Sequence, residues 1–378
     1  MVLPDYTRNG NPESEYPFAE QKNLVVRYPD LGEGSVEDGT TKLLIIREDT
    51  EFATDPIVQR LCDSYLDLDT EIVRAVIGEE YDGLMQTLVT QYAKAMPQDK
   101  LEVHLFPPGK LEQKVREYTD GCLTASLDPL SPGDVDVQMT RAHIATVKLG
   151  LRHKNGSQPM DHQLARVKDL WESTGKPVAL IDDDLYGGST SAELYRKMNS
   201  MGVPVNRFIF GCRVGEGKVL QDAGIMIASA VDYARVNQDV NTDLVDTRDF
   251  AFGYDGMSVV VPGNRDLGRV PAMLPFFQTS VDTIIPPEAE IDFSNGMWEV
   301  NIQHFYNIQN RLGVQLSLKH MHPDVYLYME QMHGFNEEMS MTDLTEWIYE
   351  NQEDLWIDTQ RRASEYQAGN TGKTLFTL

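Results

Sequence analysis

A run of acids, glycines and hydroxyls between residues 182 and 190 is the part of the sequence best equipped for chemistry. Four apolar residues, 178–181, lead into Asp182 and Asp183, and the chain continues as Asp-Leu-Tyr-Gly-Gly-Ser-Thr. A short apolar run bounded by polar residues is typical of a buried strand. Apolar residues at helical spacing follow in 194–201, so the acidic loop is expected to end at the N-terminus of a helix.

These residue types suit a ligand with a phosphate at one end and hydroxyls at the other. The free N–H groups and the dipole of a helix N-terminus favour an anion. Glycines let the backbone approach that anion, and Ser189 and Thr190 add hydroxyl donors. Two adjacent carboxylates accept hydrogen bonds from a cis-diol, or hold Mg²⁺ directly or through water. A ribose 5-phosphate meets both demands.

The segment 178–190 resembles the phosphoribosyl-pyrophosphate binding loop of type I phosphoribosyltransferases. That family has four apolar residues, two acids, a few variable residues and then Thr-Gly-x-Thr. Here the acids are Asp182 and Asp183, and Gly188 and Thr190 follow at the matching positions. The resemblance implies a Mg²⁺-dependent enzyme of nucleotide metabolism. It would transfer a phosphoribosyl group between phosphoribosyl pyrophosphate and a nitrogenous base, or catalyse the reverse pyrophosphorolysis.

The resemblance also implies a role for each residue of the loop. Asp182 and Asp183 would contact the ribose hydroxyls and, indirectly, the Mg²⁺ ion. Gly187 stands where the family usually has Thr or Ser, which removes one hydroxyl that would face the phosphate. The substrate-binding residues implied in this loop are Asp184, Tyr186, Gly187, Gly188, Ser189 and Thr190.

Two upstream segments extend the resemblance. In the family, a mobile loop with Arg, Lys and sometimes His closes over the pyrophosphate, a few tens of residues before the acidic pair. Arg152, His153 and Lys154 occupy such a place, inside the polar stretch 151–157 that we expect to be a mobile loop. We assign Arg152 and Lys154 to the pyrophosphate. Residues 128–133 are the candidate for the family's first pyrophosphate-contacting loop.

Strand, helix and strand alternate around the acidic loop, which is the pattern of a parallel sheet. We expect residues 41–235 to form a phosphoribosyltransferase-like, three-layer α/β core with a mostly parallel sheet. Asp182 should then lie at the carboxyl end of a central strand, where open α/β sheets bind ligands. Residues 1–40 are interpreted as an extended arm. The alternation fades after residue 235, so 236–378 is interpreted as a C-terminal α+β extension or second domain.

The apolar spacing predicts the individual elements. Strands are expected at 43–46, 101–105 (half-buried), 122–127, 178–181, 205–210, 225–227 and 257–261. Helices are expected at 57–66 (opened by Pro56), 84–96, 111–118, 137–147, 160–171, 194–201, 298–312 and 342–366.

A dense group of polar and aromatic residues in the C-terminal region is the candidate for contacting a base. Arg248 and Asp249 can hydrogen-bond the edge of a ring. Phe250 or Tyr254 can stack on its face, which contributes about 1–3 kcal/mol per base. We therefore predict that Phe250 or Tyr254 faces the same cleft as Asp182. The alternative is that these rings fill the seam between the two regions.

Two functions of other classes stay open. Asp182-Asp183-Asp184 also satisfies the Asp-x-Asp pattern by which nucleotide-sugar glycosyltransferases hold Mn²⁺ or Mg²⁺. A non-catalytic regulatory module could keep the phosphoribosyl cradle and use the ligand as a signal, with 236–378 contacting a partner. The substitution at Gly187 favours that second alternative.

The composition of the chain limits the classes of partner that we expect it to bind. The 378 residues include 59 acids and 33 bases, a net charge of −26, which argues against a duplex nucleic acid surface. No apolar run approaches the length that crosses a bilayer, and no signal peptide is visible. Three widely spaced cysteines fit a reducing cytoplasm. We expect small-molecule partners, phosphoribosyl pyrophosphate and a nucleobase-like acceptor, and the sequence leaves a homodimer open.

Overall fold

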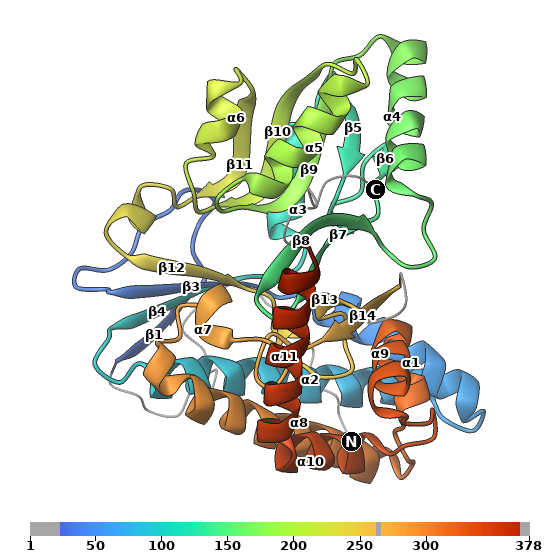
Figure 1. Cartoon of the computed structure of the whole chain (residues 1–378). Helices are drawn as coiled ribbons and strands as arrows, with labels where there is room; N and C mark the ends of the chain where they lie inside the picture. Colours follow the sequence, from blue (N-terminus) through green and yellow to red (C-terminus); the bar gives the residue numbers. More distant parts are fainter. Residues whose placement is uncertain (1–22, 130, 262–265, 371–378) are drawn as a thin grey trace.

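The computed structural model describes residues 23–129, 131–261 and 266–370. It is an α/β protein whose sheets are mostly parallel, which confirms that level of the fold prediction (Figure 1). The strands of 41–235 are nevertheless divided among three sheets, because several of them pair with strands outside that range. Part of the expected arm, residues 1–22, lies outside the described residues, and its remainder contributes two short edge strands.

The six-stranded sheet carries the acidic loop, and every pair of neighbouring strands in it is parallel. The order β2-β11-β10-β9-β5-β6 places β9 in its interior. Buried side chains on one face pack against α4, α5 and α6. Its strands are β2 (Gly32–Glu33), β5 (Leu123–Ser126), β6 (Val135–Asp136), β9 (Val178–Leu185), β10 (Val205–Arg213) and β11 (Met226–Asp232). Its helices are α4 (Met160–Thr174), α5 (Ser189–Ser200) and α6 (Lys218–Asp222).

A second parallel sheet lies against the other face of the first. It has the order β1-β4-β3-β12 and comprises β1 (Leu24–Arg27), β3 (Lys42–Arg47), β4 (Leu101–Phe106) and β12 (Asn241–Val245). Leu43 and Ile45 of β3 share a core with Ile181 and Ile209 of the first sheet and with α3 (Lys110–Glu117). All six residues of β4 are buried, so the half-buried expectation for 101–105 is wrong. Both faces of this sheet are covered.

The third sheet is mixed and joins the two halves of the sequence. Its order is β14-β13-β7-β8, with β7 (Met139–Ile144) and β8 (Val147–His153) forming an antiparallel hairpin. β7 pairs with β13 (Met257–Val260), which pairs with β14 (Leu267–Val270). The helix predicted over 137–147 is therefore wrong, because these residues pair as strands across a tight turn. The first residues of the loop predicted over 151–157 belong to β8.

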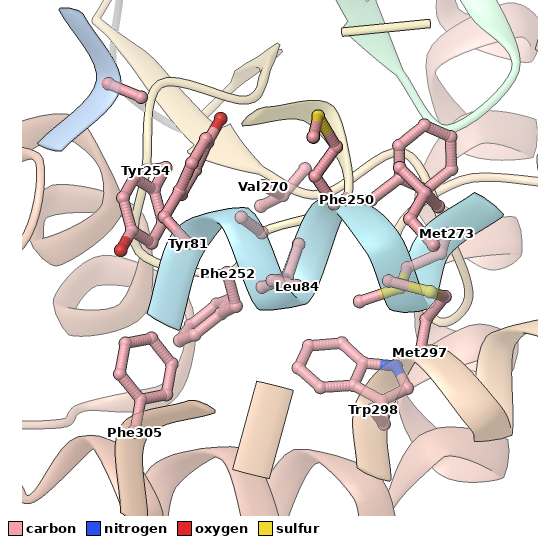
Figure 2. Packing of buried hydrophobic residues seen from close by; sticks show 14 of the residues in the cluster. Tyr81, Leu84, Phe250, Phe252, Tyr254, Val270, Met273, Met297, Trp298 and Phe305 are labelled. Carbon is pink, nitrogen blue, oxygen red and sulfur yellow. The ribbon is translucent and has the colours of Figure 1, made fainter. Parts of the chain in front are cut away.

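The largest core spans the boundary predicted at residue 235. It joins apolar residues of α1 (Thr50–Ser64), α2 (Thr70–Ala95) and β3 to those of α8 (Glu290–Leu312) and α10 (Met341–Glu350). Figure 2 shows Trp298 and Phe252 on one side of α2 and Tyr81 beside Tyr254. The ring centroids of these two pairs lie 5.6 and 5.1 Å apart.

Helix ends differ from expectation at several places. α2 begins at Thr70 and α8 at Glu290, well before the predicted starts at 84 and 298. α1 begins at Thr50, so Pro56 lies inside the helix and does not open it. The helix expected over 342–366 is divided at Asn351 into α10 and α11 (Gln352–Asn370). The remaining α-helices are α7 (Thr279–Asp282) and α9 (Pro323–His333). Among the described residues, no helix combines the length and apolar composition needed to cross a bilayer.

The buried side-chain amide of Asn301 holds the backbone of residues 250–252, which follow β12, in place. Asn301 of α8 is fully buried, and its Oδ1 accepts a hydrogen bond from the N–H of Phe252 at 2.7 Å. Its Nδ2 donates to the carbonyl of Phe250 at 3.0 Å and to that of Met297 at 2.8 Å. Asn301 therefore supplies the polar partners that the buried backbone of 250–252 requires.

We expect Asn301→Ala to lower the free energy of unfolding by about 3 kcal/mol, because it leaves buried N–H and C=O groups unpaired. Urea unfolding followed by circular dichroism measures this loss. Asn310→Ala, at an exposed position of the same helix, is the matched control. An equally small effect of both substitutions would show that water replaces the amide at no cost.

Candidate functional site

The acidic loop lies at the carboxyl end of an interior parallel strand. β9 runs through Asp182, Asp183 and Asp184 before it ends at Leu185. Gly188 caps α5 with a φ of 73°, in the left-handed region that favours glycine. Ser189 therefore begins the helix with N–H groups that have no partner inside it. The strand, the turn and the start of the helix occur in the predicted order, but the strand is four residues longer than the predicted 178–181 and includes the three acids.

A cavity of about 740 Å³ opens at this point. Residues 182–184 and 186–191 line one side of it, and β12 with the segment that follows lines another. The hairpin β7–β8 and the start of β13 contribute further residues. The two parallel sheets thus deliver polar residues to one cleft, which is where open α/β sheets bind ligands.

Two side chains hold the two sheets together at the cleft. The hydroxyl of Tyr186, in the acidic loop, donates a hydrogen bond to the carbonyl of Thr242 in β12. The guanidinium of Arg47, at the end of β3, lies 2.8 Å from Asp128 and 3.7 Å from Asp183. Tyr186 is therefore a tether between sheets, a role that the loop motif alone did not indicate.

The three consecutive carboxyls differ in their ionisation. Burial, together with the charges of Asp183 and its neighbours, raises the pKa of Asp182 well above its usual value and that of Asp184 to about 7. Burial acts to raise the pKa of Asp183, but the Arg47 guanidinium, the hydrogen bond with Asp182 and the charges of Arg141 and Arg248 together outweigh it and hold that pKa below the usual value. The loop therefore carries one firmly ionised carboxylate beside two that a cation would help to ionise.

The predicted first pyrophosphate loop lies next to the acidic loop. β5 pairs with β9 in parallel, with Ser126 opposite Ile181, so the residues after each strand emerge at the same edge of the sheet. Asp128 is buried and bound to Arg47, and Gly133 packs so closely on Thr124 that a side chain there would collide with backbone. Residue 130 lies outside the described residues.

The hairpin brings a different arginine into the cleft from the one that was predicted. Lys154 lines the cavity, and burial lowers its pKa. Arg152 is not among the cavity residues that the structure describes, so only half of the predicted pair is brought to the site. Arg141 of β7 lines the cavity instead, close enough to Asp182–Asp184 for their charges to raise its pKa despite burial.

Of the two predicted aromatic residues, one reaches the cleft. Phe250 lines the cavity, although it is only 3% exposed and packs edge-on against Tyr92 and Phe293. Tyr254 is buried, and its hydroxyl forms a 2.9 Å hydrogen bond with His304. Phe250 therefore borders the cavity that Asp182 also lines, and its contact with a base stays a prediction. Tyr254 fills the core.

Several site residues were missed because their role depends on pairing between distant strands. Arg47 acts across two sheets, and Arg141 lies in the stretch that was mistaken for a helix. Asp243, which no sequence pattern indicated, also lines the cavity, beside the predicted Asp249. No local pattern marks Arg47, and residues 139–144 do not alternate strictly between polar and apolar types, so Arg141 had no clear strand signal either.

Neither a metal-binding group among the described residues nor a known relative assigns a function to the cleft. No three His, Cys, Asp or Glu side chains of the described residues converge as a metal-binding group. Comparisons of the chain with protein-family models, with curated proteins and with solved structures give no match. The geometry of the cleft and the loop motif are therefore the features that indicate a function.

The raised pKa of Asp184 predicts a pH-dependent stability. Its folded value of about 7 lies above the unfolded value of about 4, so the proton stabilises the folded state, and this stabilisation is lost as pH rises from 4 to 7. Asp184→Asn should therefore have a higher melting temperature than the natural protein, and the difference between the two should be larger at pH 8 than at pH 5. Differential scanning calorimetry at both pH values measures it. A gain that shrinks with pH would contradict the assignment, and Asp222→Asn, at an exposed acid, is the control.

The two glycines of the loop should respond differently to substitution. An added Cβ at Gly188 imposes a strained φ and lies 3.2 Å from Leu185, whereas one at Gly187 meets no atom within 4 Å. Gly188→Ala should lower the free energy of unfolding by about 1 kcal/mol, and Gly187→Ala should change it by only a few tenths. Chemical denaturation of the pair tests this, and equal losses would show that the turn tolerates a side chain at both positions.

Proposed function

We propose that this protein is a Mg²⁺-dependent phosphoribosyltransferase with a phosphoribosyltransferase-like core. It would transfer a phosphoribosyl group between phosphoribosyl pyrophosphate and a nitrogenous base, or run the reverse pyrophosphorolysis. One observation carries the proposal. The motif of residues 182–190 spans the end of an interior parallel strand and the start of α5, and it lines the large polar cavity.

The start of α5 is suited to the 5-phosphate. Backbone N–H groups from Tyr186 to Thr190 and the hydroxyls of Ser189 and Thr190 are the donors at that end of the cavity. The dipole of the helix favours an anion at this position. Ser189 supplies a hydroxyl near the place where Gly187 lacks one.

The acidic and the cationic residues of the cleft suit different parts of the remaining ligand. Asp182 and Asp183 would accept hydrogen bonds from the ribose hydroxyls. The segment after β5 emerges beside them, and Arg141 and Lys154 enter the cavity from the hairpin, which suits the charge of a pyrophosphate. The chain order of these parts, from strand and loop to hairpin, helix and acidic loop, also agrees with the resemblance.

The donor set fits a magnesium ion. Mg²⁺ prefers oxygen ligands and is often held by one or two carboxylates together with substrate phosphates, so a complete protein cage is not needed. Burial and the neighbouring carboxyls raise the pKa values of Asp182 and Asp184, so a divalent cation would favour their ionised forms. When bound, the ion would supply charge neutralisation to the pyrophosphate.

The reaction requires the protein mainly to position the two substrates and to stabilise the departing charge. As the bond from ribose C1 to the pyrophosphate oxygen lengthens, that oxygen keeps the electron pair and C1 becomes oxocarbenium-like. A nitrogen of the base then forms the new bond to C1. Arg141 and Lys154 would stabilise the departing negative charge, and Asp182 and Asp183 would hold the ribose.

A non-catalytic binding module is the second candidate, because the hairpin belongs to a sheet. Asn155 exchanges two hydrogen bonds with the backbone of Leu267, and β7 pairs with β13, so closure over a ligand cannot follow the pattern of a free loop. A nucleotide-sugar glycosyltransferase that uses Asp182 and Asp184 is a third. A reducing, cytoplasmic setting suits all three, since Cys62, Cys122 and Cys212 form no disulfide.

Binding of phosphoribosyl pyrophosphate tests the proposal. We expect titration calorimetry to detect Mg²⁺-dependent binding, and Asp182→Asn combined with Asp183→Asn to weaken it at least tenfold, because charge-assisted hydrogen bonds to ribose are lost. Asp161→Asn and Asp169→Asn, on α4, form the control pair. Equal binding by the natural protein and the Asp182/Asp183 variant would remove the assignment.

Turnover separates the three candidates. Pyrophosphate release in the presence of a base supports the transferase, whereas tight binding without release supports the module. Preference for a nucleotide sugar with Mn²⁺ supports the glycosyltransferase.

A further inference from the structure

Asp243 is a buried carboxyl in the wall of the cavity, and the proposed function gives it no role. It lies in β12, the edge strand of the second sheet, and it lines the cleft although it is only 6% exposed. The residue before it, Thr242, is tied to the acidic loop by the hydroxyl of Tyr186. Burial and the charge of Asp243 raise the pKa of Tyr186, so that hydroxyl stays protonated. Asp243 therefore borders the same space as the residues that we assign to the ribose.

One oxygen of this carboxyl is held in place, and the other is left for a ligand. The Tyr92 hydroxyl and the N–H of Ile284 both donate to Oδ2, each at 3.3 Å. No described residue donates to Oδ1. The two donors come from α2 and from the segment after α7, so they restrain the carboxyl from two directions. Oδ1 is thus an oriented hydrogen-bond acceptor with no partner of its own in the described part of the chain.

The surroundings of Asp243 suit a carboxyl that exchanges a proton near neutral pH. Burial raises its pKa to about 7, and the charges of Asp184 on β9 and Asp282 on α7 act in the same direction. Asp282 is paired with Lys148 at 3.1 Å. The two hydrogen bonds to Oδ2 lower the pKa but do not outweigh burial. A general base is most effective when its pKa lies close to the working pH.

We propose that Asp243 is the general base of the transfer reaction, and that the acceptor is a heterocycle whose ring carries an N–H group that donates to Oδ1. This inference rests on the proposed function for the identity of the reaction. One ring nitrogen uses its lone pair to form the bond to C1 while the bond from C1 to the pyrophosphate oxygen breaks. The N–H proton of the same ring passes to Oδ1 and then to water. In pyrophosphorolysis the protonated carboxyl returns a proton to the ring.

This role selects a chemical class of acceptor. Imidazoles, purines and pyrimidine lactams carry a ring N–H and must lose its proton to give a neutral product. A pyridine carries no such proton, so it leaves the ionised Oδ1 without a donor, which costs affinity at a buried position. A protonated Asp243 would instead bind the lone pair that has to attack C1. The selection concerns the ring nitrogens, so a carboxyl substituent on the ring plays no part in it.

Asp243→Asn tests the role, because the amide keeps the shape of the carboxyl and cannot take a proton. With adenine, uracil or orotate as acceptor, we expect kcat for pyrophosphate release to fall about a hundredfold or more. Mg²⁺-dependent binding of phosphoribosyl pyrophosphate should be retained. The melting temperature should equal or exceed that of the natural protein, because a neutral amide removes a buried charge. Asp239→Asn, at an exposed acid just before β12, should leave all three unchanged.

The pH profile separates a base from a carboxyl that is merely structural. In the natural protein, kcat/KM for the acceptor should rise with pH up to about pH 7, because only the ionised carboxyl takes the proton. The rate of pyrophosphorolysis should fall over the same range. Asp243→Asn should abolish both pH dependences. Tyr92→Phe removes one donor to Oδ2 and should shift both to higher pH, whereas a structural role would leave both profiles unchanged.

The outcomes distinguish this inference from the proposed function. Pyrophosphate release that Asp243→Asn leaves unchanged would overturn the inference and leave the transferase standing. So would faster release with nicotinamide, whose ring nitrogen carries no proton, than with any of the three N–H rings. Failure to bind phosphoribosyl pyrophosphate, or binding without release in the presence of every ring, would overturn the transferase and this inference with it.

Discussion

The guanidinium of Arg47 is the interaction on which the cleft depends. It joins the end of β3 to Asp128 after β5 and to Asp183 in β9, and so connects the two parallel sheets at their carboxyl ends. Burial disfavours its charge, but the two carboxylates outweigh that cost and raise its pKa. Without this cation, the acids that gather at the strand ends would face each other in a partly enclosed space, where repulsion between like charges is strong.

The meeting of the two parallel sheets at their carboxyl ends also explains which part of the chain supplies each type of residue in the cleft. Parallel strands bring their carboxyl ends to one edge, so polar loops from separate parts of the chain meet there. The acidic loop, the segment after β5 and the open edge of β12 supply acceptors and helix N–H groups, and the hairpin supplies Arg141 and Lys154. In a chain with a net charge of −26, an anionic ligand depends on such local cations. The C-terminal region contributes by pairing β13 with the hairpin and fixing those cations in place.

The parts of this fold that were predictable are the ones encoded by local pattern. The strand 178–181, the turn at Gly188 and the helix after it form a continuous signal, and alternating strands and helices indicated a mostly parallel α/β protein. The hairpin was not predictable in the same way, because Met139–Ile144 pairs with a strand more than 100 residues later. Arg47 and Tyr254 depend on which sheet or core lies opposite them, and that information is not local.

Hydrogen–deuterium exchange with and without phosphoribosyl pyrophosphate and Mg²⁺ tests the central claim most directly, because it locates a ligand on the backbone without requiring turnover. The account predicts protection of the amides from Tyr186 to Thr190 at the start of α5, together with slower exchange in the hairpin 139–154. Protection of other segments, with the exchange of 186–190 unchanged, would contradict it.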